Sequence, residues 1–107
     1  MEVIELEKFA EWENDRIEKA SGKNNEELIN HQVLKIAEEY GEFVNEFLKI
    51  NGWQRKDKII DKETAKKDMA EEFADLILVS FLAGKRLNLN IEEELKKKIE
   101  KVKGRIY

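Results

Sequence analysis

The stretch EEFADLILVSFLA, residues 71–83, joins a pair of carboxylates to a long apolar run. Glu72 and Asp75 are three residues apart, so an α-helix would place them on the same side, one turn from each other. The run that follows, residues 76–83, would make that helix apolar on every side. A chain of 107 residues has too few other helices to cover such a helix by itself. The stretch therefore predicts an oligomer with this helix at its centre.

Three further helices are predicted around it from apolar periodicity and from residues that end helices. The first covers residues 2–20, the second residues 26–50 and the fourth residues 91–103. The helix with the apolar run begins at Asp61 or Thr64 and ends near Leu87. The expected capping residues are Gly22 after the first helix, Asn24 or Asn25 before the second, and Asn90 before the fourth, with Glu93 completing a capping box.

Apolar residues at spacings of three and four mark the faces that should form the core. Proline is absent and glycine numbers only five, which suits a chain made of helices alone. The sequence therefore predicts an all-α fold, a four-helix bundle in a single domain over residues 1–107. The predicted core residues are Ile4, Phe9, Trp12 and Ile17 in the first helix and Ile29, Val33, Ile36, Tyr40, Phe43 and Phe47 in the second.

Composition excludes several classes of function. The net charge is −4, so the surface as a whole does not attract a nucleic acid polymer, although basic residues gather at 55–58 and 96–105. Cysteine is absent, which excludes disulfides and thiolate chemistry. No stretch approaches the roughly 20 apolar residues that cross a membrane, and the acidic N-terminus does not resemble a signal peptide. A cytoplasmic protein that does not enter a membrane is expected.

A second carboxylate pair, Glu39 and Glu42, has the same spacing of three on the preceding helix. Four carboxylates converging between two helices repel one another unless a cation lies among them, and oxygen ligands suit Mg²⁺ or Mn²⁺ better than zinc. Chance is the alternative, because 24 acidic residues in this chain make such pairs common on solvated faces. Asp75 favours the functional reading, since an unpaired carboxylate buried beside the apolar run would cost several kcal/mol.

The two pairs also lie in recognisable motifs. Residues 36–43, IAEEYGEF, resemble the EExxE motif of the MazG-like, all-α nucleoside triphosphate pyrophosphohydrolases. Residues 72–77, EFADLI, resemble the ExxD motif of that family, in the expected order on the next long helix. The resemblance covers residues 32–105. The chain departs from the family in a long segment between the motifs and in Val102, where many members carry asparagine before the last arginine.

The resemblance implies Mg²⁺-dependent cleavage of (d)NTP to (d)NMP and pyrophosphate, with Mn²⁺ as the other suitable ion and a house-cleaning role for the enzyme. Glu39, Glu42, Glu72 and Asp75 are then the metal ligands, and Glu38 accepts a proton from the attacking water or holds a second ion. The basic residues that it assigns to the phosphates are Lys98, Lys101 and Arg105.

The residues themselves leave alternatives open. The three basic residues could simply complement the dipole at a helix end. Trp53 could stack on a nucleobase or close the core, whereas Trp12 favours the core. Two rival functions remain. One is a non-enzymatic helical module whose acidic stripe binds a basic partner, and the other is the same fold acting on phosphoribosyl-ATP. The enzyme reading expects a nucleotide substrate and a homodimer or homotetramer.

Overall fold

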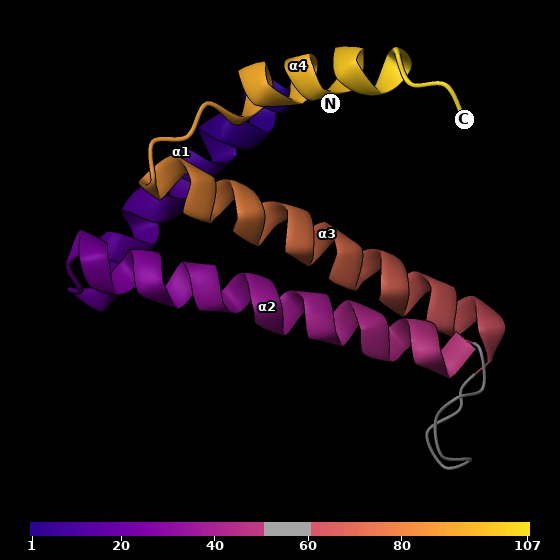
Figure 1. The fold of residues 1–107 in the computed structure, drawn as a ribbon. Helices are drawn as coiled ribbons and strands as arrows, with labels where there is room; N and C mark the ends of the chain where they lie inside the picture. Colours follow the sequence, from indigo (N-terminus) through magenta and orange to yellow (C-terminus); the bar gives the residue numbers. More distant parts are fainter. Residues whose placement is uncertain (51–60) are drawn as a thin grey trace. The chain divides into compact units, whose positions relative to one another are not determined.

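Four helices make up the part of the chain that the computed structural model describes, residues 1–50 and 61–107. They are α1 (Val3–Ser21), α2 (Asn25–Ile50), α3 (Lys62–Arg86) and α4 (Ile91–Lys103), and Figure 1 shows their order along the chain. These residues contain no strand, so the predicted all-α class is confirmed, and the helix ends fall within about two residues of the predicted ones. None of the described helices has the length and apolarity needed to cross a membrane.

The helix ends follow the predicted caps. Gly22 adopts φ +66°, the left-handed conformation that glycine accepts without strain, and its N–H donates to the carbonyl of Glu18. The side chains of Asn24, Asp61 and Asn90 each accept a hydrogen bond from the backbone N–H three residues further on, at 2.9, 3.0 and 3.2 Å. At α3 the cap is therefore Asp61 rather than Thr64.

The chain forms two compact units, one made of Met1–Ile29 with Phe81–Tyr107 and the other of Asn30–Ser80. In the first unit α1 packs against the C-terminal end of α3, where the side chain of Asn14 donates to the carbonyl of Leu82. Four buried apolar side chains form its core: Ala10, Leu28, Phe81 and Ala83. No residue of α4 is buried.

The predicted core face of α1 is largely wrong, because only Ile17 of its four residues is half-buried. Trp12 is 56 % exposed and Phe9 37 %, and Ile4 is exposed as well, whereas Ala10 and Asn14 are the buried residues of this helix. Small Ala10 allows close approach to α3, and the Asn14 amide donates to the carbonyl of Leu82 at 3.0 Å, which compensates its burial. The indole of Trp12 lies on the outside, with the guanidinium of Arg16 4.6 Å from its ring centre.

Arg86 ties the helices of the first unit together. Its guanidinium donates to the backbone carbonyl of Asn14 at 2.7 Å and to the side-chain oxygen of Asn25 at 3.1 Å, and it lies 3.6 Å from the carboxylate of Glu18. Only 4 % of the Arg86 side chain is exposed. One buried cation therefore connects α1, the start of α2 and the end of α3.

Replacing Arg86 by methionine should lower the free energy of unfolding by about 2 kcal/mol, because buried acceptors lose a charged donor. Chemical denaturation followed by circular dichroism measures the change. Arg16→Met is the matched control, since the ion pair of Arg16 with Glu13 lies on the surface and should contribute less than about 1 kcal/mol. Equal losses of unfolding free energy in the two variants would show that the buried hydrogen bonds of Arg86 add nothing to stability beyond a surface ion pair.

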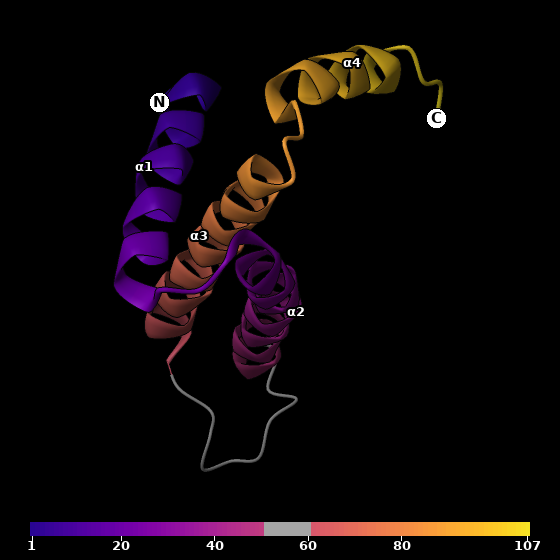
Figure 2. The same ribbon diagram turned by 90° about the vertical axis from the view of Figure 1, so that its left-hand side faces the viewer.

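In the second unit, α2 and α3 run side by side and antiparallel (Figures 1 and 2). The rings of Phe43 and Phe73 meet edge to face with their centres 5.1 Å apart. The predicted apolar stripe of α2 is only partly correct: Ile29, Ile36 and Phe43 are half-buried, whereas Val33, Tyr40 and Phe47 are exposed. Among the described residues of this unit, 30–50 and 61–80, the buried ones are Gln32, Glu39 and Ala65.

Candidate metal centre

Five carboxylates of the second unit gather between α2 and α3. They form two groups, Glu38 with Glu39 and Glu42, and Glu39 with Glu72 and Asp75. Within each group, one oxygen from every carboxylate lies within 4.8 Å of the others. The spacing of three residues on each helix produces this arrangement, because such residues share a helix face. Glu39 belongs to both groups and so occupies the middle of the cluster.

Glu39 is the most deeply placed of the five carboxylates. The residue is 6 % exposed, and its Oε2 atom is buried and accepts no hydrogen bond. The Oε2 atom of Glu72 is likewise buried and accepts none. Leaving a charged oxygen without a partner away from water is costly. A hard cation that takes oxygen ligands would satisfy both atoms, so the residues present fit Mg²⁺ or Mn²⁺.

The pKa of Glu72 reflects how closely the negative charges of the cluster lie together. Burial, a hydrogen bond with Glu42 and the nearby charges of Glu42, Glu39 and Asp75 together raise the pKa of Glu72 from 4.5 to about 7, with burial as the largest cause. The hydrogen bond also links Glu42 on α2 to Glu72 on α3. Near neutral pH the cluster therefore holds a proton at this position, which a divalent cation would displace.

The structure corrects the expectation that Asp75 is the buried acid. Asp75 is exposed, and Glu39 has the environment that the sequence suggested for Asp75. An apolar run beginning at the next residue does not bury Asp75, because neighbouring residues of a helix point about 100° apart. Glu38 is also exposed, as is Glu42, so the cluster extends from a buried centre to a solvated rim.

Sequence reasoning missed Lys35. Its ammonium lies 3.3 Å from Oε1 of Glu39 and 3.6 Å from Oε1 of Glu38. The signal was available in the sequence, because Lys35 precedes these two glutamates by three and four residues and such pairs meet on a helix surface. The Lys35 ammonium therefore compensates Oε1 of the buried Glu39, whereas Oε2 has no hydrogen-bond partner.

The residues predicted to bind phosphate do not join this cluster within the second unit. Lys98 and Lys101 lie on α4 and Arg105 follows it, all in the first unit, and all three are exposed. Trp53 falls in residues 51–60, outside the described part of the chain. The assignments of these four residues therefore stay predictions.

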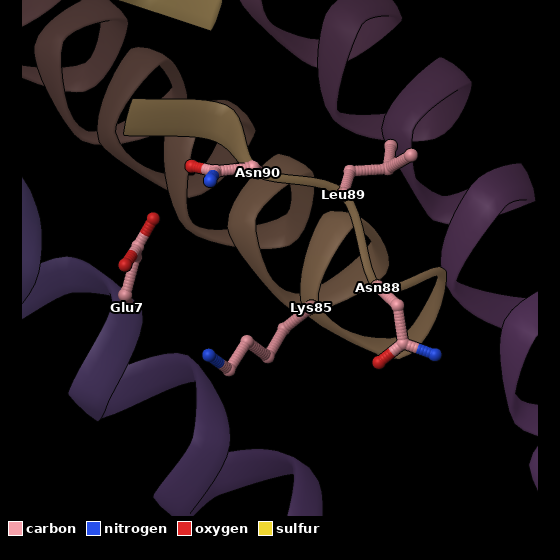
Figure 3. Close-up of a pocket in the computed structure, with 5 residues that line it drawn as sticks. All are labelled: Glu7, Lys85, Asn88, Leu89 and Asn90. Atoms are coloured by element: carbon pink, nitrogen blue, oxygen red, sulfur yellow. The ribbon is translucent and has the colours of Figure 1, made fainter. Parts of the chain in front are cut away.

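A pocket of the first unit offers a different set of groups. Figure 3 shows Glu7 and Lys85 on opposite walls, with Asn88, Leu89 and Asn90 from the connector between α3 and α4. Its single carboxylate and single ammonium balance each other in charge. It contains no group of metal-ligating side chains, so the acidic cluster of the second unit is the stronger candidate site.

Comparison with models of protein families, with curated proteins and with solved structures finds no match for this chain.

Proposed function

We propose that this protein is a MazG-like, Mg²⁺-dependent nucleotide pyrophosphohydrolase that cleaves (d)NTP to (d)NMP and pyrophosphate. The observation that carries the proposal is the position of Glu39, which is shared by two carboxylate groups and has a buried oxygen without a hydrogen bond. The order of the two motifs on consecutive helices of an all-α chain supports it further. Clearance of unwanted nucleotides is the role that this activity would serve.

Each carboxylate has a distinct task in this proposal. Glu39, Glu42, Glu72 and Asp75 would hold the ion, which when bound supplies charge neutralisation at the phosphates and a more acidic water. Glu38, which is 57 % exposed at its side chain, would accept the proton of the attacking water. The water oxygen forms the new bond to the α-phosphorus, the bond to the bridging oxygen breaks, and pyrophosphate leaves with that oxygen.

We also propose that the functional form is a homodimer or homotetramer, assembled as a MazG-like bundle. Ala65 is the only apolar residue buried among the described residues of the second unit. The apolar run is incompletely covered as well, since Ile77 is exposed and Leu76, Leu78 and Val79 are only half-buried. Two helices with so little buried apolar area are not stable alone, and a second copy would cover them.

Light scattering after size-exclusion chromatography tests the assembly. We expect a mass of at least twice the 12.7 kDa of one chain at micromolar concentration. Dilution should cause dissociation together with loss of helical signal, because the second unit has little core of its own. A folded species of 12.7 kDa that unfolds cooperatively would contradict this part of the proposal.

Pyrophosphate release from a substrate panel tests the function. The panel contains the common NTPs and dNTPs, noncanonical nucleotides and phosphoribosyl-ATP, each with Mg²⁺, with Mn²⁺ and with a chelator. Metal-dependent release from an NTP or dNTP is the expected result. Pyrophosphate release from phosphoribosyl-ATP alone would identify that compound as the substrate instead. A lack of release from every compound would favour a non-enzymatic helical module that binds a basic partner.

A further inference from the structure

Lys35 is a cation in direct contact with two carboxylates of the proposed metal centre. Its ammonium pairs with Glu39 at 3.3 Å and with Glu38 at 3.6 Å. The Lys35 side chain is 38 % exposed, whereas that of Glu39 is 7 % exposed. Lys35 therefore lies at the solvent edge of the cluster, on the side where Glu38 reaches water.

The other ion pairs between described residues do not involve the five carboxylates of the cluster. Lys49 pairs with Glu46 further along α2, and the remaining pairs of lysine or arginine lie on α1, on α4 or in the Arg86 network. Among the residues of the second unit that the structure describes, 30–50 and 61–80, Lys35 is thus the one cation in direct contact with a proposed metal ligand.

Binding of a divalent ion would weaken the ion pairs that the Lys35 ammonium makes with the cluster. Without the ion, Lys35 compensates the charge of Glu39 and Glu38. Once carboxylate charge is taken up by a divalent ion, the attraction that holds the ammonium weakens, and Lys35 is left with an unbalanced charge at the mouth of the cluster. Phosphate oxygens that approach the ion would then meet a lysine beside it, and lysine is a common point-charge ligand for phosphate.

We infer that Lys35 is a phosphate-binding residue of this site, exchanging its carboxylate partners for a phosphate group of the nucleoside triphosphate. The inference rests on the proposed function, since it needs a polyphosphate substrate at the carboxylate cluster. It assigns a substrate contact on the same helix as the metal ligands, independent of the basic residues of α4 and its C-terminal extension. Lys35 and the bound ion together would hold the phosphates from two sides.

The test uses the full chain and the variants Lys35→Met and Lys35→Arg. Lys49→Met is the matched control, because it breaks another lysine–glutamate pair of α2, one that involves no carboxylate of the cluster. Two ligands are titrated by calorimetry: Mn²⁺ alone, and a non-hydrolysable α,β-methylene triphosphate analogue in the presence of Mg²⁺. The kcat and KM for the best substrate of the panel complete the measurement.

For Lys35→Met we expect the affinity for the analogue to fall by about tenfold or more, because one charged contact is lost. The KM should rise accordingly. Mn²⁺ affinity should stay the same or increase, because a competing cation has been removed. Lys35→Arg should recover part of the analogue affinity, and Lys49→Met should match the unaltered chain in both titrations.

Two results would overturn the inference. Unchanged analogue affinity in Lys35→Met would show that Lys35 does not contact phosphate. Mn²⁺ affinity reduced by about 10–100-fold with an unchanged KM would instead make Lys35 a residue that positions Glu39. Failure of the proposed function is distinct from both, because the unaltered chain would then bind neither Mn²⁺ nor the analogue and would release no pyrophosphate.

Discussion

Replacing Glu39 by glutamine should abolish divalent-cation binding and lower turnover by more than about a hundredfold. Changing residues that merely support metal ligands already costs about 10–100-fold, and Glu39 is a proposed ligand shared by both carboxylate groups. Glutamine keeps the size of the side chain but removes the charge and one acceptor oxygen. The loss of metal binding should therefore be measurable by Mn²⁺ titration, independently of any activity assay.

Glu72→Gln and Asp75→Asn should have the same effect, because each removes a member of the group around Glu39. Glu71→Gln is the matched control: Glu71 neighbours Glu72 on α3, is exposed, and belongs to neither group. Circular dichroism should show equal helix content in all four variants. Normal kcat and normal Mn²⁺ affinity in the Glu39 and Glu72 variants would rule out the metal centre.

The metal-free protein should lose stability as the pH rises from about 5 to about 8. The pKa of Glu72 is about 7 in the folded chain against an ordinary value of 4.5, so between these values the folded state holds a proton that the unfolded state releases. Stability falls with pH wherever the folded state binds more protons, so this contribution is present below pH 4.5 and lost by about pH 7. Thermal unfolding in the presence of a chelator, at constant protein concentration, measures the trend.

Two comparisons isolate the contribution of Glu72. In Glu72→Gln the decline between about pH 5 and about pH 8 should be much smaller, since the titrating group is gone. In the unaltered chain, Mg²⁺ should restore stability most strongly at the upper end of this range, where the carboxylate is charged and ready to bind. A decline of the same size in Glu72→Gln would assign the pH dependence to other groups.

The helices and their ends could be predicted from the sequence because the forces that set them are local. Gly22, Asn24 and Asn90 act on backbone groups within four residues of themselves, so their effect is visible in the sequence. The spacing that places Glu39 beside Glu42 on one face and Glu72 beside Asp75 on another is equally local. The members of the candidate site could therefore be chosen from the sequence, although their metal-binding role stays a prediction.

Burial could not be predicted in the same way. The sequence favoured Phe9 and Trp12 for the core of α1, but a hydrogen bond between Asn14 and Leu82, 68 residues apart, accompanies the packing of the opposite face against α3. Likewise, the amphipathic pattern of α2 did not reveal that Glu39 would be buried. The packing of α3 along α2 decides that, since it places Glu72 next to Glu42 and Glu39.

The helices, their caps and the two carboxylate pairs follow from local sequence, because hydrogen bonds and side-chain spacing within one or two turns fix all of these. Which acid lies deepest and which apolar faces remain uncovered became visible only in the folded chain. These features depend on how one helix is rotated against another, and contacts between residues far apart in the chain set that rotation. Asp75 and Glu39 show the difference, since both have strong local signals but only Glu39 faces the interior.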